Sequence, residues 1–347
     1  MNKNIILVHE IFAGLDQEYL SKKWFGNDPL LSRQMRLSQD ILAVFAVKKS
    51  DGKHILYLQC NSEDAVKGSK YPAWKGIAID FSGFENAGME GSYVRIEQNE
   101  ESADEVYFAV ADDLCACLQG IKRNHLRKEL SIALERWSRF FSLRDNIKLS
   151  QEEQLGLFGE LWMVRSMIQN DVGIQAIDYW KGPYRNVFDF SLQKMGIEIK
   201  TTASKRPYKV FINNEVQLSD RLAGGTLILG FIAVQPNDAT GEALRDVAKE
   251  IEEYVKHNGT VHSLFQDKIF GCGLGKPYID SYMTRYIVKE HAFFKVEEGF
   301  PRILSENLQN GLGDVSYSLE IGACSDYKMG DHQFWQIVQQ FVKEEIA

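Results

Sequence analysis

The sequence lacks the features that define several protein classes. No apolar run approaches the roughly 18 residues of a membrane-spanning helix, which argues against a membrane segment. The amino-terminal stretch MNKNIILVHEIF is interrupted by His9 and Glu10, and no small-residue cleavage site follows it, so we expect no secretory signal. These absences predict a cytoplasmic protein that does not bind membranes.

Cysteine and histidine are sparse and scattered. The only close pair among the five cysteines, Cys115 and Cys117, has no second pair or nearby histidine to complete a zinc site. We therefore expect reduced thiols and no structural metal. The seven histidines form no HxH, HxxxH or Ser/His/Asp grouping, which argues against a histidine-metal or triad enzyme. Gly271–Gly275 has glycines but no following Lys-Ser/Thr, and we expect a turn there rather than a phosphate loop.

The composition is that of an ordinary globular protein, with 44% hydrophobic and 25% charged residues in a chain of 347, long enough for two domains. The net charge of −8 is unevenly spread. Between Lys181 and Val210, seven basic residues accompany two acids, a local charge of +5 that leaves −13 for the rest. A basic island around paired acids suits a metal-dependent phosphodiesterase, and a solvated basic face is the alternative.

The two acids of this island lie in a predicted β-hairpin. Val187–Leu192 and Gly196–Thr201 are short alternating segments separated by the tight turn Gln193-Lys194-Met195. A third strand is expected near Lys209–Asn213. The pattern predicts that the acids occupy neighbouring antiparallel strands.

Period-2 geometry places Glu198 and Lys200 on the same face of their strand, and antiparallel pairing brings Asp189 toward Glu198. Two carboxylates can hold a hard cation such as Mg²⁺, while an ammonium can orient a hydrolytic water or stabilise the charge on a phosphodiester. The alternative is a solvated ion pair between Glu198 and Lys200, which would contribute little to stability.

An acid-x-Lys tripeptide alone is a weak signal, because it also occurs at Asp51–Lys53 and Asp326–Lys328. The first of these is expected in a hairpin turn and the second in a polar loop. Only Glu198 is flanked by alternating apolar residues and has an acid on the preceding strand.

The helix before the hairpin carries another acid. Ser150 and Glu153 fit a capping box that begins a helix extending to about Gln169. Glu160 interrupts the otherwise apolar segment GLFGELWM, so its carboxylate must be solvated, paired or bound to a ligand. A site role is one interpretation, and the alternatives are an exposed position on the helix surface or an ion pair with Arg165.

The spacing of Asp189, Glu198 and Lys200 resembles the PD-(D/E)XK nuclease superfamily, although Phe188 stands where that pattern usually has proline. The resemblance implies that Asp189, Glu198 and the Ile199 carbonyl hold Mg²⁺, which Mn²⁺ can replace. It also implies that Lys200 assists the water and that Glu160 contributes to the metal site. The chain further resembles an uncharacterised bacterial family of PD-(D/E)XK proteins encoded near restriction and phage-defence genes. The matching motifs are ERWSRFF, LSQEEQLGLFGELWMV, YWKGPYRNVFDFSL, GIEIKTT, NNEVQL, HAFFKVEEGFPRI and GDVSYSLEI.

Polar and basic residues around the hairpin are expected to contact DNA phosphates through hydroxyl, ammonium and guanidinium groups. Gln217 is expected either to support the site or simply to begin a short helix. The predicted DNA-contacting residues are Arg185, Thr201, Thr202, Ser204, Lys205 and Arg206.

Before the hairpin, short alternating segments predict a β-rich domain over residues 1–112, including a strand at Val106–Ala111. Asp112 or Asp113 is expected to cap a long helix from Leu114 to about Leu143, within a basic connecting segment at 113–149.

The expected fold is α/β (α+β), with a restriction-endonuclease-like αβββαβ core at 150–260. Thr226–Val234 is predicted to be a buried strand, followed by a helix from Asp238 or Thr240 to about His257. Residues 261–347 are expected to form a mixed α/β extension.

Together these features predict a Mg²⁺-dependent DNA endonuclease of a restriction or phage-defence system. Cutting both strands favours a homodimer. One alternative is a DNA-binding or assembly subunit that needs a partner ATPase or methyltransferase. Another is a protein-interaction scaffold whose acids are structural.

Overall fold

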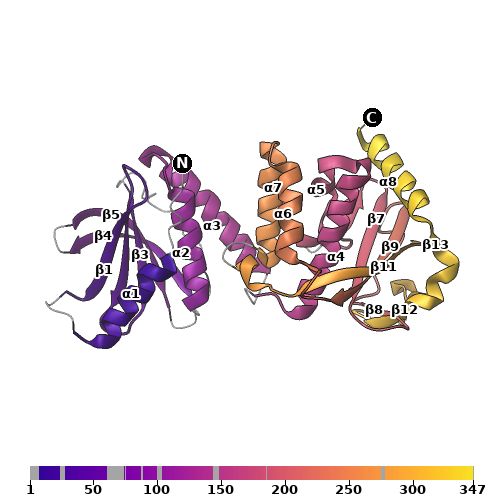
Figure 1. Cartoon of the computed structure of the whole chain (residues 1–347), viewed down its shortest axis with the longest axis horizontal. Coiled ribbons are helices and arrows are strands. Elements are labelled where there is room, and N and C mark those ends of the chain that lie inside the picture. The colour runs from indigo at the N-terminus through magenta and orange to yellow at the C-terminus, as the bar shows by residue number, and fades with distance from the viewer. Residues whose placement is uncertain are drawn as a thin grey trace. The chain divides into compact units, whose positions relative to one another are not determined.

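The computed structural model describes residues 8–23, 28–60, 74, 76–86, 89–99, 104–143, 148–184, 186–274 and 278–346. The fold is mixed α/β, as predicted. It divides into two compact units, Met1–Ile147 and Lys148–Ala347 (Figure 1). No helix in these described ranges is both long enough and apolar enough to cross a membrane.

The first unit is built on a five-stranded antiparallel sheet in the order β1-β2-β3-β5-β4. Its β2–β3 hairpin turns at Asp51 and Gly52, as predicted, and Gly52 adopts a φ of 75° that favours glycine. The strands are β1 (Leu30–Arg36), β2 (Leu42–Lys48), β3 (His54–Cys60), β4 (Ile77–Asn86) and β5 (Met89–Gln98).

Three α-helices in the described residues accompany this sheet: α1 (Val8–Ser21), α2 (Asp104–Leu118) and α3 (Leu126–Leu143). The strand predicted at 106–111 is wrong, because these residues lie within α2. A short apolar run fits a strand or a buried helix equally well. The contacts that decide between the two structures are made with residues distant in sequence. One is the ring of Phe108, which stacks on Phe12 of α1.

The single long helix predicted from residue 114 is also wrong. Gly120, with a φ of 77°, follows the end of α2 and donates its N–H to the Leu37 carbonyl. Asp112 lies inside α2, and its carboxylate accepts a hydrogen bond from the Val8 N–H at 3.0 Å. Asp112 therefore provides a hydrogen-bond acceptor for the first N–H group of α1 and does not cap the start of another helix.

The second unit contains a sheet in the order β10-β11-β9-β7-β6, with β13 paired to β11. β7 and β9 are parallel, and the other pairs are antiparallel. β9 is buried along most of its length, as predicted. The strands are β6 (Phe190–Leu192), β7 (Met195–Thr202), β9 (Thr226–Pro236), β10 (Glu242–Ala243), β11 (Arg285–Val296) and β13 (Lys328–Met329).

The predicted third strand forms as β8 (Lys209–Ile212), but it pairs with β12 (Tyr317–Glu320) in a separate two-stranded sheet. The described residues between β8 and β9 contain no helix. The Asn214 side chain accepts hydrogen bonds from the N–H groups of Val216 and Gln217, which makes this segment a turn.

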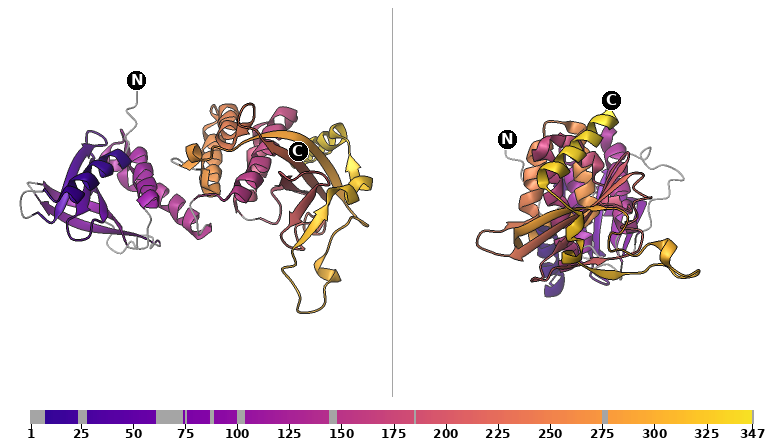
Figure 2. Two further views of the ribbon diagram at one scale, coloured as in Figure 1. Left: turned by 60° about the horizontal axis from the view of Figure 1, so that its bottom comes forward. Right: turned by 90° about the vertical axis from the view of Figure 1, so that its right-hand side faces the viewer.

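Five α-helices complete the described part of the second unit: α4 (Gln151–Met167), α5 (Ala176–Tyr179), α6 (Leu244–Val255), α7 (Gly259–Ile269) and α8 (Asp331–Ile346). α4 begins with the predicted capping box. α6 begins later than expected, because β10 intervenes. α4 lies beside α6, and α6 beside α7 (Figures 1 and 2).

Helix α4 approaches β7 closely at Gly159. A Cβ atom at this position would lie 1.8 Å from Thr201 Oγ1 and 3.1 Å from Thr201 Cβ, so only glycine fits without movement. At Gly156, one turn earlier, a Cβ atom would have no neighbour within 4 Å. Close packing therefore joins the helix that carries Glu160 to the strand that carries Glu198 and Lys200.

Gly159→Ala should lower the free energy of unfolding by about 1–3 kcal/mol, the usual cost of overpacking. Gly156→Ala is the matched control, and it should stabilise the helix by roughly 0.5–1 kcal/mol. Urea unfolding of both variants measures the difference. Equal stability of the two variants would contradict the close α4–β7 contact.

Candidate active site

The predicted hairpin is confirmed, although its first strand begins at Phe190 and not at Val187, and Met195 belongs to the second strand and not to the turn. Phe190 pairs with Ile197 and Leu192 with Met195, so Asp189, directly before β6, is placed opposite Glu198. Asp189 Oδ2 accepts a hydrogen bond from the Ile199 N–H at 2.7 Å. The Asp189 carboxylate thus accepts the Ile199 N–H in place of a backbone carbonyl, at the point where β6 has not yet begun.

Two features hold Asp189 in place. Its backbone carbonyl accepts hydrogen bonds from the N–H groups of Lys181 at 2.6 Å and Gly182 at 3.1 Å. The preceding Phe188 is buried, and a Cβ at Gly196 would lie 2.7 Å from its ring. An aromatic ring packed on a glycine therefore occupies the position where the motif usually has proline.

Glu198 and Lys200 form an ion pair, with Lys200 Nζ 2.9 Å from Glu198 Oε1. The alternative of a solvated pair is wrong, because only 2% of the Glu198 side chain and 12% of the Lys200 side chain are exposed. Lys200 Nζ also donates to Gln217 Oε1 at 3.1 Å, and the same oxygen accepts from the Asn213 N–H at 2.9 Å. The turn after β8 therefore fixes the lysine.

Glu160 is half-buried on α4 and does not pair with Arg165, which binds Glu242 and Glu250 instead. Its Oε2 accepts a hydrogen bond from Trp180 Nε1 at 2.7 Å. A Cβ at Gly182 would lie 2.0 Å from the same oxygen, so the chain after Trp180 passes directly over the carboxylate. The only sequence signal for this contact was the tryptophan in YWKGPYRN. The local sequence pattern did not identify Glu160 as its partner.

The surroundings favour the protonated forms of all three acids. Burial raises the pKa of Asp189 to about 6, although the Ile199 N–H and Lys200 oppose the shift. Burial, then the nearby charge of Asp189, raises the pKa of Glu198 to about 8, with Lys200 opposing. Burial and the charge of Asp189 also raise the pKa of Glu160 well above its ordinary value. A single ammonium does not offset the cost of ionising these groups together.

The oxygen atoms at this site fit a hard cation. Asp189 and Glu198 supply carboxylates, and the N–H and C=O of a strand residue point to the same side, so the Ile199 carbonyl faces the edge occupied by Asp189. A bound cation would also favour the ionised forms, which burial disfavours at both acids and which the charge of Asp189 further disfavours at Glu198. Within the described ranges, no three His, Cys, Asp or Glu side chains form a ready-made metal cluster. The fitting donor set is thus two carboxylates and a carbonyl, with Glu160 held aside by Trp180.

The residues expected to contact phosphates differ in their exposure and in the elements that carry them. Arg185 lies outside the described residues. Thr201 and Thr202 both belong to β7, whereas the predicted strand ended at Thr201. The Thr201 hydroxyl is buried without a partner in the described structure, and the Thr202 hydroxyl contacts Ser204 Oγ at 2.9 Å. The strand therefore ends one residue later than predicted.

Ser204, Lys205 and Arg206 do lie in an exposed loop. Arg206 forms an ion pair with Glu290, and its guanidinium lies 5.5 Å from the centre of the Tyr208 ring. These three residues can reach a ligand outside the protein, whereas the threonines of β7 cannot do so without rearrangement.

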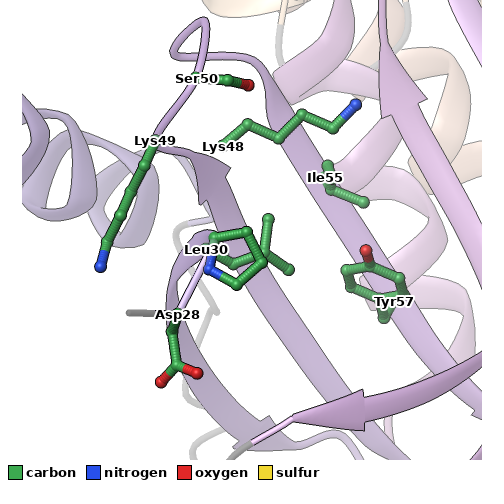
Figure 3. Close-up of a pocket in the computed structure, with 8 residues that line it drawn as sticks. Asp28, Leu30, Lys48, Lys49, Ser50, Ile55 and Tyr57 are labelled. Atoms are coloured by element: carbon green, nitrogen blue, oxygen red, sulfur yellow. The ribbon is translucent and has the colours of Figure 1, made fainter. Parts of the chain in front are cut away.

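Two open pockets of about 630 Å³ are lined by residues other than the acids of the site. One, in the first unit, is lined by Leu30, Ile55, Tyr57 and charged residues including Lys48 (Figure 3). The other includes Arg206 and the residues around it. Neither pocket is lined by Asp189, Glu198 or Lys200.

Comparison with known families gives one match. A family model described as "Putative PD-(D/E)XK family member, (DUF4420)" matches residues 8–322 of the chain. No curated protein and no solved structure matches it. The matched range includes both the hairpin and α4.

The raised pKa of Glu198 predicts how stability depends on pH in the absence of metal. Between its ordinary pKa of 4.5 and about 8, the folded protein binds more protons than the unfolded chain, so stability falls as pH rises through this window. Glu198→Gln removes this penalty. In EDTA, its advantage over the parent should be larger at pH 9 than at pH 5, by on the order of 2 kcal/mol.

Thermal and urea unfolding at the two pH values measure this difference. Glu298→Gln, at an exposed position, is the control and should show the same difference from the parent at both pH values. A Glu198→Gln advantage that does not change with pH would contradict the burial of an ionisable Glu198.

Proposed function

Since the chain belongs to the DUF4420 family of PD-(D/E)XK proteins, we propose that it is a Mg²⁺-dependent DNA endonuclease of a restriction or phage-defence system. The observation that carries this proposal is the junction of buried Glu198 with half-buried Asp189 and Lys200 at the end of a two-stranded hairpin. Burying like charges together is costly, so their retention next to an ammonium points to chemistry rather than to stability.

Asp189, Glu198 and the Ile199 carbonyl would hold the cation. When bound, Mg²⁺ or Mn²⁺ would supply Lewis-acid stabilisation and lower the pKa of a hydrolytic water. Glu160 would act from the outer shell of the site, since Trp180 holds its carboxylate.

Lys200 would orient the water or stabilise the charge that develops on the phosphodiester. Gln217 fixes its ammonium within reach of Glu198, which limits the motion of the catalytic group. Ser204, Lys205 and Arg206 would contact the DNA backbone from the loop after β7.

The test is cleavage of supercoiled plasmid, methylated and unmethylated, with Mg²⁺, Mn²⁺ or EDTA. The parent should nick or linearise the DNA only with metal. Lys200→Ala should lose at least about 100-fold in rate, as expected when a group acting on the reacting atoms is removed. Lys194→Ala removes an exposed lysine from the turn of the same hairpin. The cleavage rate of this variant should stay within about threefold of the parent rate, since an exposed lysine in the turn is not expected to contact the reacting atoms.

Cleavage by Lys200→Ala at the parent rate would refute the assignment of the catalytic lysine. DNA binding without cleavage under any metal would instead favour the subunit that requires a partner.

A further inference from the structure

A fully buried lysine lies on the helix next to the site. Lys268 of α7 is only 1% exposed, and its ammonium is not paired with a carboxylate in the described structure. Its Nζ donates to the Ile177 carbonyl at 2.5 Å and to the Trp180 carbonyl. It also lies 6.0 Å from the ring centre of Trp180 and 5.3 Å from that of Tyr184. A buried ammonium is costly, so these contacts must be strong enough to retain it.

The two carbonyls belong to the end of the short helix α5, where carbonyl groups lack partners within the helix. Lys268 therefore acts as a cap supplied by another helix. Burial, followed by the nearby charge of Lys181, lowers the pKa of Lys268 to about 8. Lys268 is thus still protonated at neutral pH, and the two carbonyl groups stabilise its ammonium.

The segment that Lys268 holds is attached to two of the site acids. The Trp180 indole donates to Glu160, and the backbone of Trp180 bridges to Phe190 beside Asp189. The next two residues donate their N–H groups to the Asp189 carbonyl. Displacement of Trp180 would therefore move both Glu160 and Asp189.

We propose that Lys268 is a positioning residue of the candidate site: its ammonium holds residues 180–182, and these residues in turn fix the Glu160 carboxylate and the backbone of Asp189. The role of the acids in metal binding rests on the proposed function, but the mechanical link through Trp180 does not. A purely structural lysine would support folding without coupling to Glu160.

The link is measured by ¹⁹F NMR of protein labelled with 5-fluorotryptophan, in which Trp180→Phe assigns the Trp180 signal. In the parent, Glu160→Gln should shift this signal, because the indole donates to that carboxylate. In a Lys268→Met background, which keeps the volume but not the donors, the shift caused by Glu160→Gln should be lost. Lys268→Arg keeps the charge and the donors and should restore it in part.

The consequence is measured by Mn²⁺ titration calorimetry. Lys268→Met and Trp180→Phe should each weaken Mn²⁺ binding by about 10-fold or more, the usual effect of removing an outer-shell support. Lys249→Met, at an exposed position of α6, should bind with parent affinity.

An unchanged Glu160-dependent shift in Lys268→Met would overturn the proposal. If that variant does not fold, Trp180→Phe tests the link from its other end, and parent Mn²⁺ affinity in Trp180→Phe would overturn it as well. If the parent itself binds no Mn²⁺, the proposed function fails, while the ¹⁹F comparison still decides the role of Lys268.

Discussion

The burial of two facing carboxylates beside one ammonium is the constraint on which the second unit depends. Glu198 is buried and Asp189 is half-buried, the charge of Asp189 disfavours ionisation of Glu198, and Lys200 offsets only part of that cost. The protein supplies further compensation locally, through the Ile199 N–H bound to Asp189. Buried acids of this kind are unfavourable for folding, and the proposed function would make that cost the usual compromise between stability and activity.

The surrounding elements hold this junction from several directions. The parallel pairing of β7 with buried β9 fixes the strand that carries Glu198 and Lys200. Gly159 allows α4 to approach the same strand, which brings Glu160 near the acids. Gln217 fixes the ammonium from a turn 17 residues later, and Lys268 holds the segment over Glu160 from a still more distant helix. Rigid support of this kind is what a precise catalytic geometry requires.

Local patterns in the sequence predicted the parts of the site that depend on local geometry. The hairpin followed from period-2 alternation around a tight turn, and the start of α4 followed from the capping box at Ser150. The buried strand β9 was predictable from its continuous apolar run. The approach of Asp189 to Glu198 then followed from the antiparallel pairing of the two strands of the hairpin.

The parts that depend on distant contacts could not be predicted in the same way. The apolar run around Tyr107 fits a strand as well as a helix, and packing against α1 decided between them. The partner of Glu160 is 20 residues away, at Trp180. Lys268 gave no signal at all, because a lysine in a helix is normally solvated and only its distant carbonyl partners make it exceptional.

The most direct test of the central claim is a crystal soaked in Mn²⁺ and measured at a wavelength where manganese scatters anomalously. The account predicts a peak within about 2.0–2.6 Å of oxygen atoms from both Asp189 and Glu198, as expected for a hard cation bound by carboxylates. Absence of that peak at saturating Mn²⁺, or a peak only at other residues, would contradict a metal-dependent site at this hairpin.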